Sequence, residues 1–352
     1  METEILFSDK LILAVIVFSV SLGIAMYATW GERKIASFLQ DRIGPNRAGI
    51  FGLLQPVADG VKLFMKEEII PANADKTLFI LGPSLTMVTA LMTSAVIPWG
   101  TYLEIGDRNV VMQITDINIG VLYVFAVVSI GVYGIMIGGW AANNKFSLMG
   151  AVRASSQMIS YEIAMGFSII AIVMMSGSMS IREIVNSQSG GLYGIAALKG
   201  LDWNIFYQPL GFLIFIICAF AECNRTPFDL PECEAELNGG YHSEYSSMKL
   251  GLYLFAEYIN MFVSSAIMAS LYFGGYNFPG IEALGLGQNL TAILGLGALF
   301  TKILFFIFFF MWVRWTIPRF RYDQLMTLGW KYLIPLSLLN IIVTGLVMIL
   351  TK

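Results

Sequence analysis

Eight stretches of the chain are almost continuously apolar, and the segments between them carry most of the polar side chains. Most of the eight reach the roughly 17–25 residues that an α-helix needs to cross a bilayer. The runs are Leu11–Thr29, Leu78–Ile97, Ile117–Gly139, Tyr161–Ser176, Ile205–Ala221, Leu250–Phe273, Leu290–Val313 and Leu333–Leu350. The pattern predicts an all-α polytopic integral membrane protein, with eight transmembrane helices in a single membrane domain over residues 1–352.

The overall composition favours the same class. Hydrophobic residues make up 57% of the chain and charged residues 13%, with a mean hydropathy of +0.72, which is far from the balance of soluble domains. Long uninterrupted runs exclude a transmembrane β-barrel, whose strands alternate apolar and polar positions. The first run lacks a basic leader and a small-residue cleavage site, so we expect a retained helix and not a signal peptide.

Basic residues are distributed unevenly between the two sides of the predicted bundle. Alternate connections, at residues 31–76, 140–160, 222–249 and 314–331, hold 15 of the 21 Lys and Arg residues. Because cytoplasmic loops carry an excess of Lys and Arg, these connections are expected in the cytoplasm. An even number of spans then puts both termini on the outer side of the membrane.

The first connection contains an amphipathic segment between Gly52 and Glu68. At about 100° per residue, one arc of a helix there is apolar, while Asp59, Lys62 and Lys66 lie opposite. Leu63 interrupts the pattern and Glu68 falls inside the apolar arc. The apolar arc consists of Leu53, Leu54, Val57, Val61, Phe64 and Met65. We expect this helix to lie in the membrane interface and not to cross the bilayer.

The other connections differ in character. Residues 98–116 form an acidic outside loop with an interfacial Trp, and residues 177–204 are rich in Gly and Ser, with one short helix expected around Ile181–Val185. The segment from Arg314 to Asp323 is basic and aromatic, which suits anionic lipid headgroups or an acidic partner protein. No feature indicates nucleic-acid binding.

Carboxylates are concentrated between Cys218 and Glu257, where seven of the 24 acidic residues lie within 40 positions. Glu222 and Glu257 are in or at the edge of apolar runs, and Glu162 opens the fourth run near its predicted cytoplasmic edge. Carboxylates next to hydrocarbon are costly to ionise and mark a proton path, an ion path or a polar cavity. Lys302, in the middle of the seventh run, requires a buried partner or water for the same reason.

Metal-binding side chains are scarce. The chain has three Cys and one His, and Cys218, Cys223 and Cys233 form no C-x-x-C pair, whereas an iron–sulfur cluster commonly takes four thiolates. We therefore predict that the chain binds no metal, and that any redox centres belong to partner subunits.

Several motifs occur together in the cytoplasmic connections. They are Glu32-Arg-Lys, Gly44-Pro-Asn-Arg, Leu54-Gln-Pro-Val-Ala-Asp-Gly-Val-Lys-Leu, Ser160-Tyr-Glu and Ala221-Glu-Cys-Asn-Arg-Thr-Pro-Phe-Asp-Leu-Pro-Glu-Cys-Glu-Ala-Glu-Leu. Over essentially its whole length the chain resembles the H-subunit family of bacterial NADH:quinone oxidoreductase (NADH-quinone oxidoreductase), respiratory complex I. Cys223 and Cys233 stand where Thr and Ala are expected, which replaces one small side chain by another.

The resemblance implies a membrane-arm component that forms most of the tunnel admitting ubiquinone or menaquinone from the bilayer. It places the chain in a bacterial cytoplasmic (inner) membrane, so both termini are expected on the periplasmic side. The residues matching tunnel positions are Arg33, Asp59 and Lys62. The carboxylates matching the polar path towards the proton-pumping subunits are Glu162, Glu222, Glu234, Glu236 and Glu257. It further implies that this chain binds no cofactor of its own, and that FMN and the iron–sulfur clusters are in neighbouring subunits, next to the quinone headgroup.

These features lead to one mechanistic hypothesis and leave two alternatives. Quinone reduction consumes protons, and we expect the resulting change of charge to shift protonation along the carboxylates and so drive proton translocation. A homologous component of a membrane-bound hydrogenase or formate hydrogenlyase would have similar motifs without needing a quinone. A secondary ion transporter would also use buried carboxylates, but it would be expected to show an internal repeat of broken spans, and none is apparent.

Overall fold

The computed structural model describes residues 7–106, 108–191, 200–229, 238–280 and 287–350. Its α-helices are α1 (Phe7–Leu39), α2 (Gln55–Met65), α3 (Lys76–Thr93), α4 (Gly120–Ala141), α5 (Lys145–Ser176), α6 (Ile181–Ser187), α7 (Asn204–Tyr207), α8 (Pro209–Glu222), α10 (Ser247–Tyr272), α11 (Gln288–Thr316), α12 (Tyr322–Thr327) and α13 (Ile334–Leu350). Short 3-10 turns cover Ile50–Gly52, Ser94–Val96 and Gly240–His242, a π-helical turn covers Leu328–Leu333, and two strands, β1 (Tyr102–Ile105) and β2 (Arg108–Val111), pair antiparallel.

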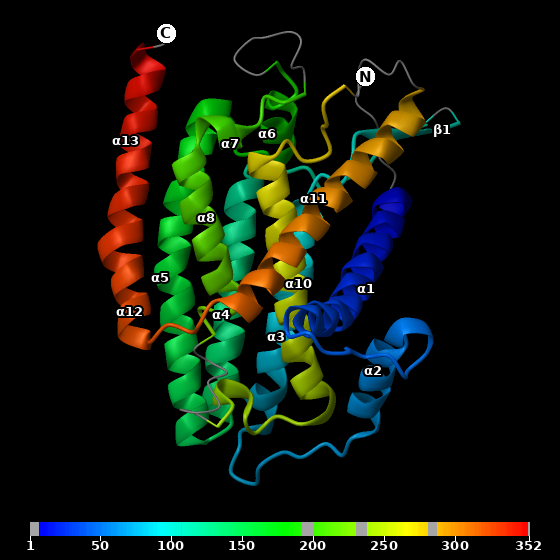
Figure 1. Cartoon of the computed structure of the whole chain (residues 1–352), viewed down its shortest axis with the longest axis vertical. Coiled ribbons are helices and arrows are strands. Elements are labelled where there is room, and N and C mark those ends of the chain that lie inside the picture. The colour runs from blue at the N-terminus through cyan, green and yellow to red at the C-terminus, as the bar shows by residue number, and fades with distance from the viewer. Residues whose placement is uncertain (1–6, 107, 192–199, 230–237, 281–286, 351–352) are drawn as a thin grey trace.

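A helical bundle with α10 at its centre forms the membrane domain. Within the described residues, seven helices are long and apolar enough to cross a membrane, and α8 is a shorter apolar helix of 14 residues. In α10, 78% of the most apolar window is buried, against 22% in α1 and in the helix formed by Tyr322–Leu350. Figure 1 shows that α1 begins and α13 ends at the same end of the bundle. The prediction of a helical, multi-pass membrane protein is confirmed.

Small side chains allow the other helices to approach α10. Ser265, Ala266, Ala269 and Ser270 are fully buried on its second half. Small residues bring helix backbones close together in lipid, where the hydrophobic effect no longer drives helices to associate. A related close approach joins α10 to α4, where a side chain at Gly138 would overlap the Tyr253 hydroxyl.

Three helices are longer than their apolar runs predict. α1 continues ten residues beyond Thr29, α5 begins at Lys145 and not at Tyr161, and the last helix begins at Tyr322 and not at Leu333. Hydropathy falls where Lys, Arg and Glu enter these sequences, but the three extensions contain no Pro, and the helices continue through Gly31, Gly150 and Gly329. In α5 the side chain of Asn144 accepts a hydrogen bond from the Phe146 amide at 2.9 Å, which caps the extended helix.

The fifth predicted span is divided in two. Gln208 has φ −128° and ψ 54°, outside the helical region, because the following Pro209 disfavours helical geometry at the residue before it. The Gln208 side-chain amide donates to the Thr344 hydroxyl at 2.7 Å and accepts from Asn340 at 2.9 Å. The break between α7 and α8 therefore anchors α13, which is otherwise largely exposed.

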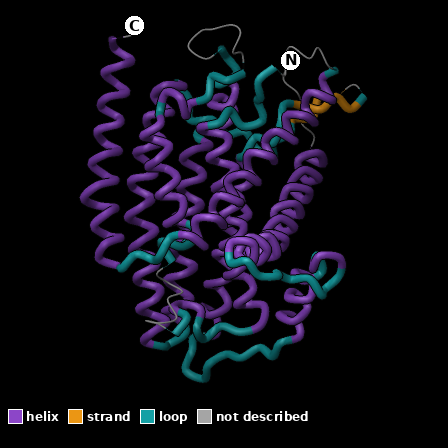
Figure 2. Tube along the Cα trace, viewed as in Figure 1, coloured by secondary structure: helices purple, strands orange, loops and turns teal. Residues whose placement is uncertain are grey.

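The acidic loop predicted at 98–116 contains the β1–β2 hairpin, so the fold is not entirely helical. Figure 2 shows this pair of strands at the edge of the bundle end where α1 begins. The hairpin is attached to the start of α11, because the side chain of Asn289 bonds both the amide and the carbonyl of Glu104, at 2.7 and 2.9 Å. The short helix predicted around Ile181–Val185 is confirmed as α6.

A short helix, α2, occupies the segment for which an amphipathic helix is predicted, and the apolar residues from Leu53 to Met65 that form the predicted arc are exposed on the surface of the chain. The exposed fraction ranges from 40% at Leu53 to 83% at Met65. Glu68 does not lie on this arc, which corrects the prediction. The helix ends at Met65 and Lys66 has extended geometry, so the chain turns away before Glu68 is reached.

Lys302 has the buried partners that its position requires. Its ammonium group donates to the carbonyls of Phe273, Gly275 and Asn277, each at 2.7 Å. It also lies 5.0 Å from the centre of the Trp203 ring. Lys302 thus holds the segment after α10 against the middle of α11.

Replacing Lys302 by Met is expected to destabilise the protein, because three carbonyls lose a charged donor and each buried unsatisfied group costs on the order of 1–3 kcal/mol. The midpoint temperature of thermal unfolding of the detergent-solubilised protein, measured by circular dichroism, should fall by several degrees. Lys331→Met, at an exposed position, is the matched control. Equal midpoints for the two variants would contradict a stabilising role for Lys302.

Candidate functional site

A cavity of about 720 Å³ lies between α1, α2 and α10. One part of its lining is polar, with Glu32, Arg33, Asp59, Lys62, Lys66 and Tyr258. Another part is apolar, with Met26, Leu63, Leu250, Leu254 and Phe255. A cavity with both kinds of wall suits an amphiphilic molecule that has a polar head and a hydrocarbon tail.

The three residues predicted for a tunnel lie together at this cavity. Arg33 approaches the Asp59 carboxylate at 2.7 Å, and Lys62 lies 4.0 Å from its other oxygen. Asp59 and Lys62 belong to the polar face of α2, whereas Arg33 projects from the extension of α1 beyond its apolar run. The polar face of α2 is therefore turned towards the cavity, and the apolar face is turned away from it.

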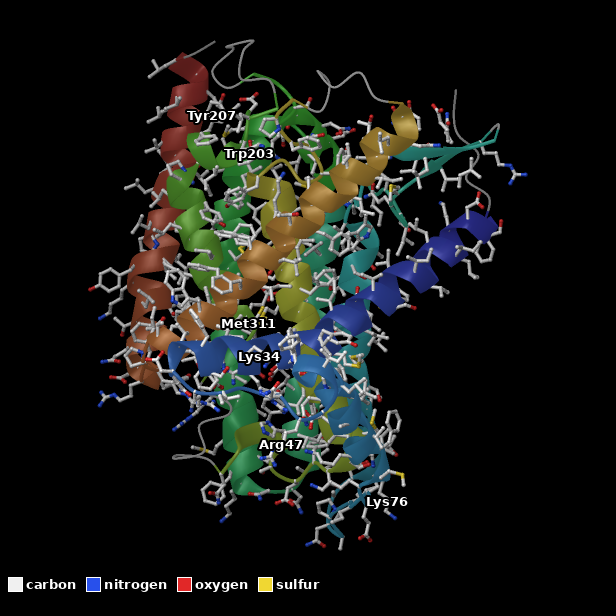
Figure 3. All side chains as sticks on the ribbon, turned by 45° about the vertical axis from the view of Figure 1, so that its right-hand side comes forward. Lys34, Arg47, Lys76, Trp203, Tyr207 and Met311 are labelled. Carbon is white, nitrogen blue, oxygen red and sulfur yellow. The ribbon has the colours of Figure 1, made fainter. Side chains whose placement is uncertain are left out.

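A buried charge cluster around Glu32 closes the cavity on the side of α11. Glu32 is only 6% exposed, and its two oxygens pair with Arg314 at 2.6 Å and Arg225 at 3.2 Å. The Tyr258 hydroxyl donates to Glu32 at 2.7 Å, and the Arg225 guanidinium lies over the Tyr258 ring at 4.1 Å. Figure 3 shows the labelled Lys34 of α1 next to the labelled Met311 of α11 in this region.

In the sequence, Glu32 belongs to the Glu32-Arg-Lys motif, and no other feature marks it as a functional residue. Its signal is a single acidic residue directly after an apolar run, which is indistinguishable from an ordinary charge at the end of a span. Its partners are Arg225, Tyr258 and Arg314, which are distant from Glu32 in the sequence, so the cluster forms only when the chain folds.

Glu222, at the end of α8, lies between two small cavities in the interior of the bundle. Their volumes are about 30 and about 20 Å³, above the roughly 10–15 Å³ that one water requires. Both are lined by Glu222, Asn260 and Thr93, and the smaller is also lined by Glu257. Glu222 and Glu257 therefore face one small polar cavity.

Glu162 lies near the middle of α5 and not close to a helix end, because α5 begins earlier than predicted. The hydroxyl of Ser129 on α4 donates to its carboxylate. Glu162 and Glu222 also interact electrostatically. Two of the predicted carboxylates are thus close enough for the charge of one to affect the other.

Glu257 is 9% exposed and accepts a hydrogen bond from the Tyr241 hydroxyl at 3.0 Å. Tyr241, Tyr245 and Tyr253 pack edge to face, with ring centres 5.1 Å apart in each of the two contacts. Burial raises the pKa of the Tyr245 hydroxyl to about 12, so it stays protonated and donates to the Gly138 carbonyl at 3.1 Å. Glu234 and Glu236 lie outside the described residues.

The large cavity and the buried carboxylates share two structural elements. Tyr258 lines the large cavity, while its neighbour Glu257 lines the small one, because successive helix residues point about 100° apart. The last residue of α8, Glu222, likewise lines the small cavities, and the turn that follows carries Arg225 to the Glu32 cluster. A movement of α10 or of this turn would alter both sites.

Known proteins resemble this chain over nearly its entire length. A family model described as NADH dehydrogenase matches residues 11–345. The NADH-quinone oxidoreductase H subunit numbered 1 in Cytophaga hutchinsonii is 70% identical, covering 96% of each chain, and the H subunit of Flavobacterium psychrophilum is 64% identical, covering 98% of each. The more distant H subunit of Thermomicrobium roseum is 47% identical, covering 94% of each chain.

Proposed function

The chain belongs to the NADH dehydrogenase family, among the H subunits of NADH-quinone oxidoreductase, and we propose that its large cavity admits the quinone while its buried carboxylates link quinone reduction to proton translocation. The chain is a membrane component of this enzyme complex. The hydrogenase component and the ion transporter are therefore set aside. FMN, the iron–sulfur clusters and the NADH site are assigned to partner subunits.

The lining of the large cavity supports quinone binding. A quinone has a polar headgroup and an apolar isoprenoid tail, and the cavity offers Arg33, Asp59 and Lys62 beside Leu250 and Leu254. The tail would enter from the bilayer along the apolar wall, and the headgroup would pass the charged residues on its way to a neighbouring subunit. The substrate is ubiquinone or menaquinone.

The observation that carries the coupling is that α10, and the segment from the end of α8 to Arg225, contribute residues to both sites. Quinone reduction at the far end of this passage takes up protons, and the resulting change of charge would act on Tyr258 and Glu32, which line the cavity. That change of charge would shift the protonation of Glu257 and Glu222. It would act through the position of the shared backbone segments and through electrostatic interactions, which are strong in the low dielectric of the interior. Protonation would then pass among Glu257, Glu222 and Glu162, with Glu234 and Glu236 completing the path.

The arrangement of helices supports a topology with eight crossings. The seven long apolar helices and α8 give an even number, and α1 begins at the end of the bundle where α13 ends (Figure 1). The Lys and Arg distribution then assigns both termini to the periplasm and α2 to the cytoplasmic interface, with its apolar arc in the lipid. Subunits of the peripheral arm would dock on the cytoplasmic end, and small membrane subunits on the exposed helix faces.

Asp59→Asn tests the role of the cavity. Without the carboxylate, Arg33 and Lys62 lose their shared partner, so their position and the charge along the cavity change. We expect the KM for a long-chain quinone to rise about five- to tenfold, equivalent to roughly 1–1.4 kcal/mol, while kcat stays close to that of the wild type. The measurement is NADH:quinone reductase activity in membranes, with assembly checked on a native gel.

Asp41→Asn is the matched control, because Asp41 is exposed and Asn tolerates its left-handed backbone, with φ 48°. An unchanged KM in a fully assembled Asp59→Asn complex would count against quinone passage along this cavity.

A further inference from the structure

The segment that follows α2 is fastened to the beginning of α10 by a group of contacts, here called the clasp. On one side it comprises Leu63, Glu67, Glu68 and Ile69, and on the other Ser246, Ser247 and Lys249. The Glu68 carboxylate and the Lys249 ammonium group form an ion pair. Neither member of this pair is among the residues that line the large cavity.

Two hydroxyl groups complete the clasp. The amide of Ile69 donates to the Ser246 hydroxyl oxygen at 2.9 Å, and the Ser247 hydroxyl donates to the carbonyl of Leu63 at 3.1 Å. Leu63 is in the last turn of α2, where carbonyls have no partner within the helix. Ser247 is the first residue of α10, and its hydroxyl binds a carbonyl in the last turn of α2. This hydrogen bond joins the end of one helix to the beginning of the other.

The clasp lies directly beside the large cavity. Leu63 and Lys66 form its wall on the α2 side, and Leu250 and Leu254 form its wall on the α10 side. Lys249 precedes Leu250 in the chain, and Glu68 follows Lys66 by two residues. The Glu68–Lys249 ion pair consequently joins the two elements that form these walls, and it limits the distance between them.

The two halves of the ion pair are held differently. The Lys249 side chain is 10% exposed and lies 5.4 Å from the centre of the Phe79 ring, which stacks on Tyr245 at 4.0 Å. The Glu68 side chain is 55% exposed, in a segment without helical hydrogen bonds. Lys249 is thus a fixed point on the bundle, and the segment after α2 is the part that can separate from it.

We propose that the Glu68–Lys249 pair is a positioning contact that sets the width of the large cavity and thereby controls the entry of long-chain quinones. The proposal rests on the proposed function in assigning the quinone to this cavity. Lys249 and Glu68 touch no reacting atom. They act through the position of α2 relative to α10.

A charge exchange tests this contact in the assembled complex. Glu68→Lys and Lys249→Glu should each raise the KM for a long-chain quinone about five- to tenfold with kcat nearly unchanged, and the double exchange should restore the KM. Glu68→Gln gives a milder test should Lys249→Glu fail to assemble, and Lys249→Arg should behave as the wild type. Glu67 takes part in the clasp only through its backbone carbonyl, so Glu67→Gln, which changes its exposed side chain alone, is the matched control.

A second measurement reports the cavity without using quinone. Leu254→Cys places a thiol on the cavity wall, and its rate of reaction with a water-soluble maleimide is measured after subtracting the reaction of the parent complex. The rate should rise several-fold with either single exchange and return with the double exchange. If the rate responds but the KM does not, the clasp holds the wall and the quinone takes another path, which counts against the proposed function. If neither responds, the clasp proposal is overturned.

Discussion

Replacing Glu32 by Gln is expected to remove most of the quinone reductase activity and to reduce the amount of assembled complex. The carboxylate pairs with Arg225 and Arg314 in a buried site, and the amide removes the negative charge that both guanidinium groups share. Removing one partner of a buried ion pair typically costs about 3–5 kcal/mol. The measurement combines the abundance of the protein in membranes, a native gel, and NADH oxidation with quinone or with a hydrophilic artificial acceptor.

A double variant separates charge balance from the loss of a particular side chain. Glu32→Gln with Arg314→Met removes one charge of each sign, so it should recover part of the abundance that Glu32→Gln loses. Arg314→Met alone should be destabilising, because Glu32 is then paired only with Arg225. If the losses of the two single variants simply add in the double variant, the cluster is not an electrostatic unit.

The sequence predicted the identity of the spans better than their lengths. Apolar runs locate each long helix, but a run ends at the first charged residues. The helix itself can continue beyond that point when its charged side chains form ion pairs. α1 illustrates this, because Glu32 is stabilised by arginines nearly 200 and 300 positions away. The hairpin at Tyr102–Val111 was missed for a different reason. Its strands have four residues each, too few for alternation to emerge from a polar loop.

The candidate site was predicted where a local pattern existed. Asp59 and Lys62 share the polar face of α2, and the periodicity of that helix is visible in the sequence. The chain order alone does not show that this face meets α10, nor that Glu68 leaves the helix to pair with Lys249. Long-range pairs of this kind depend on helix packing, which a hydropathy pattern does not specify.

Glu222→Gln and Glu162→Gln are each expected to lower quinone reduction and proton translocation together. Glu222 faces both small cavities, and Glu162 interacts with it from α5, so an amide at either position removes a group that can take up and release a proton. A positioned proton-transfer group commonly contributes about 10²–10⁴ in rate. We therefore expect a loss of at least about tenfold in both activities, measured in inverted membrane vesicles with a pH-sensitive dye.

The side-chain volumes hardly change in these variants, so assembly and NADH oxidation by a hydrophilic acceptor should be preserved. Glu104→Gln is the matched control, because Glu104 is an exposed carboxylate on the hairpin and lines neither cavity. Loss of proton translocation with normal quinone reduction would mean that the carboxylates conduct protons without controlling electron transfer. Wild-type values for both activities in both variants would show that Glu162 and Glu222 do not link the quinone cavity to pumping. The fact that α10 lines both the large and the small cavities would then be of structural importance alone.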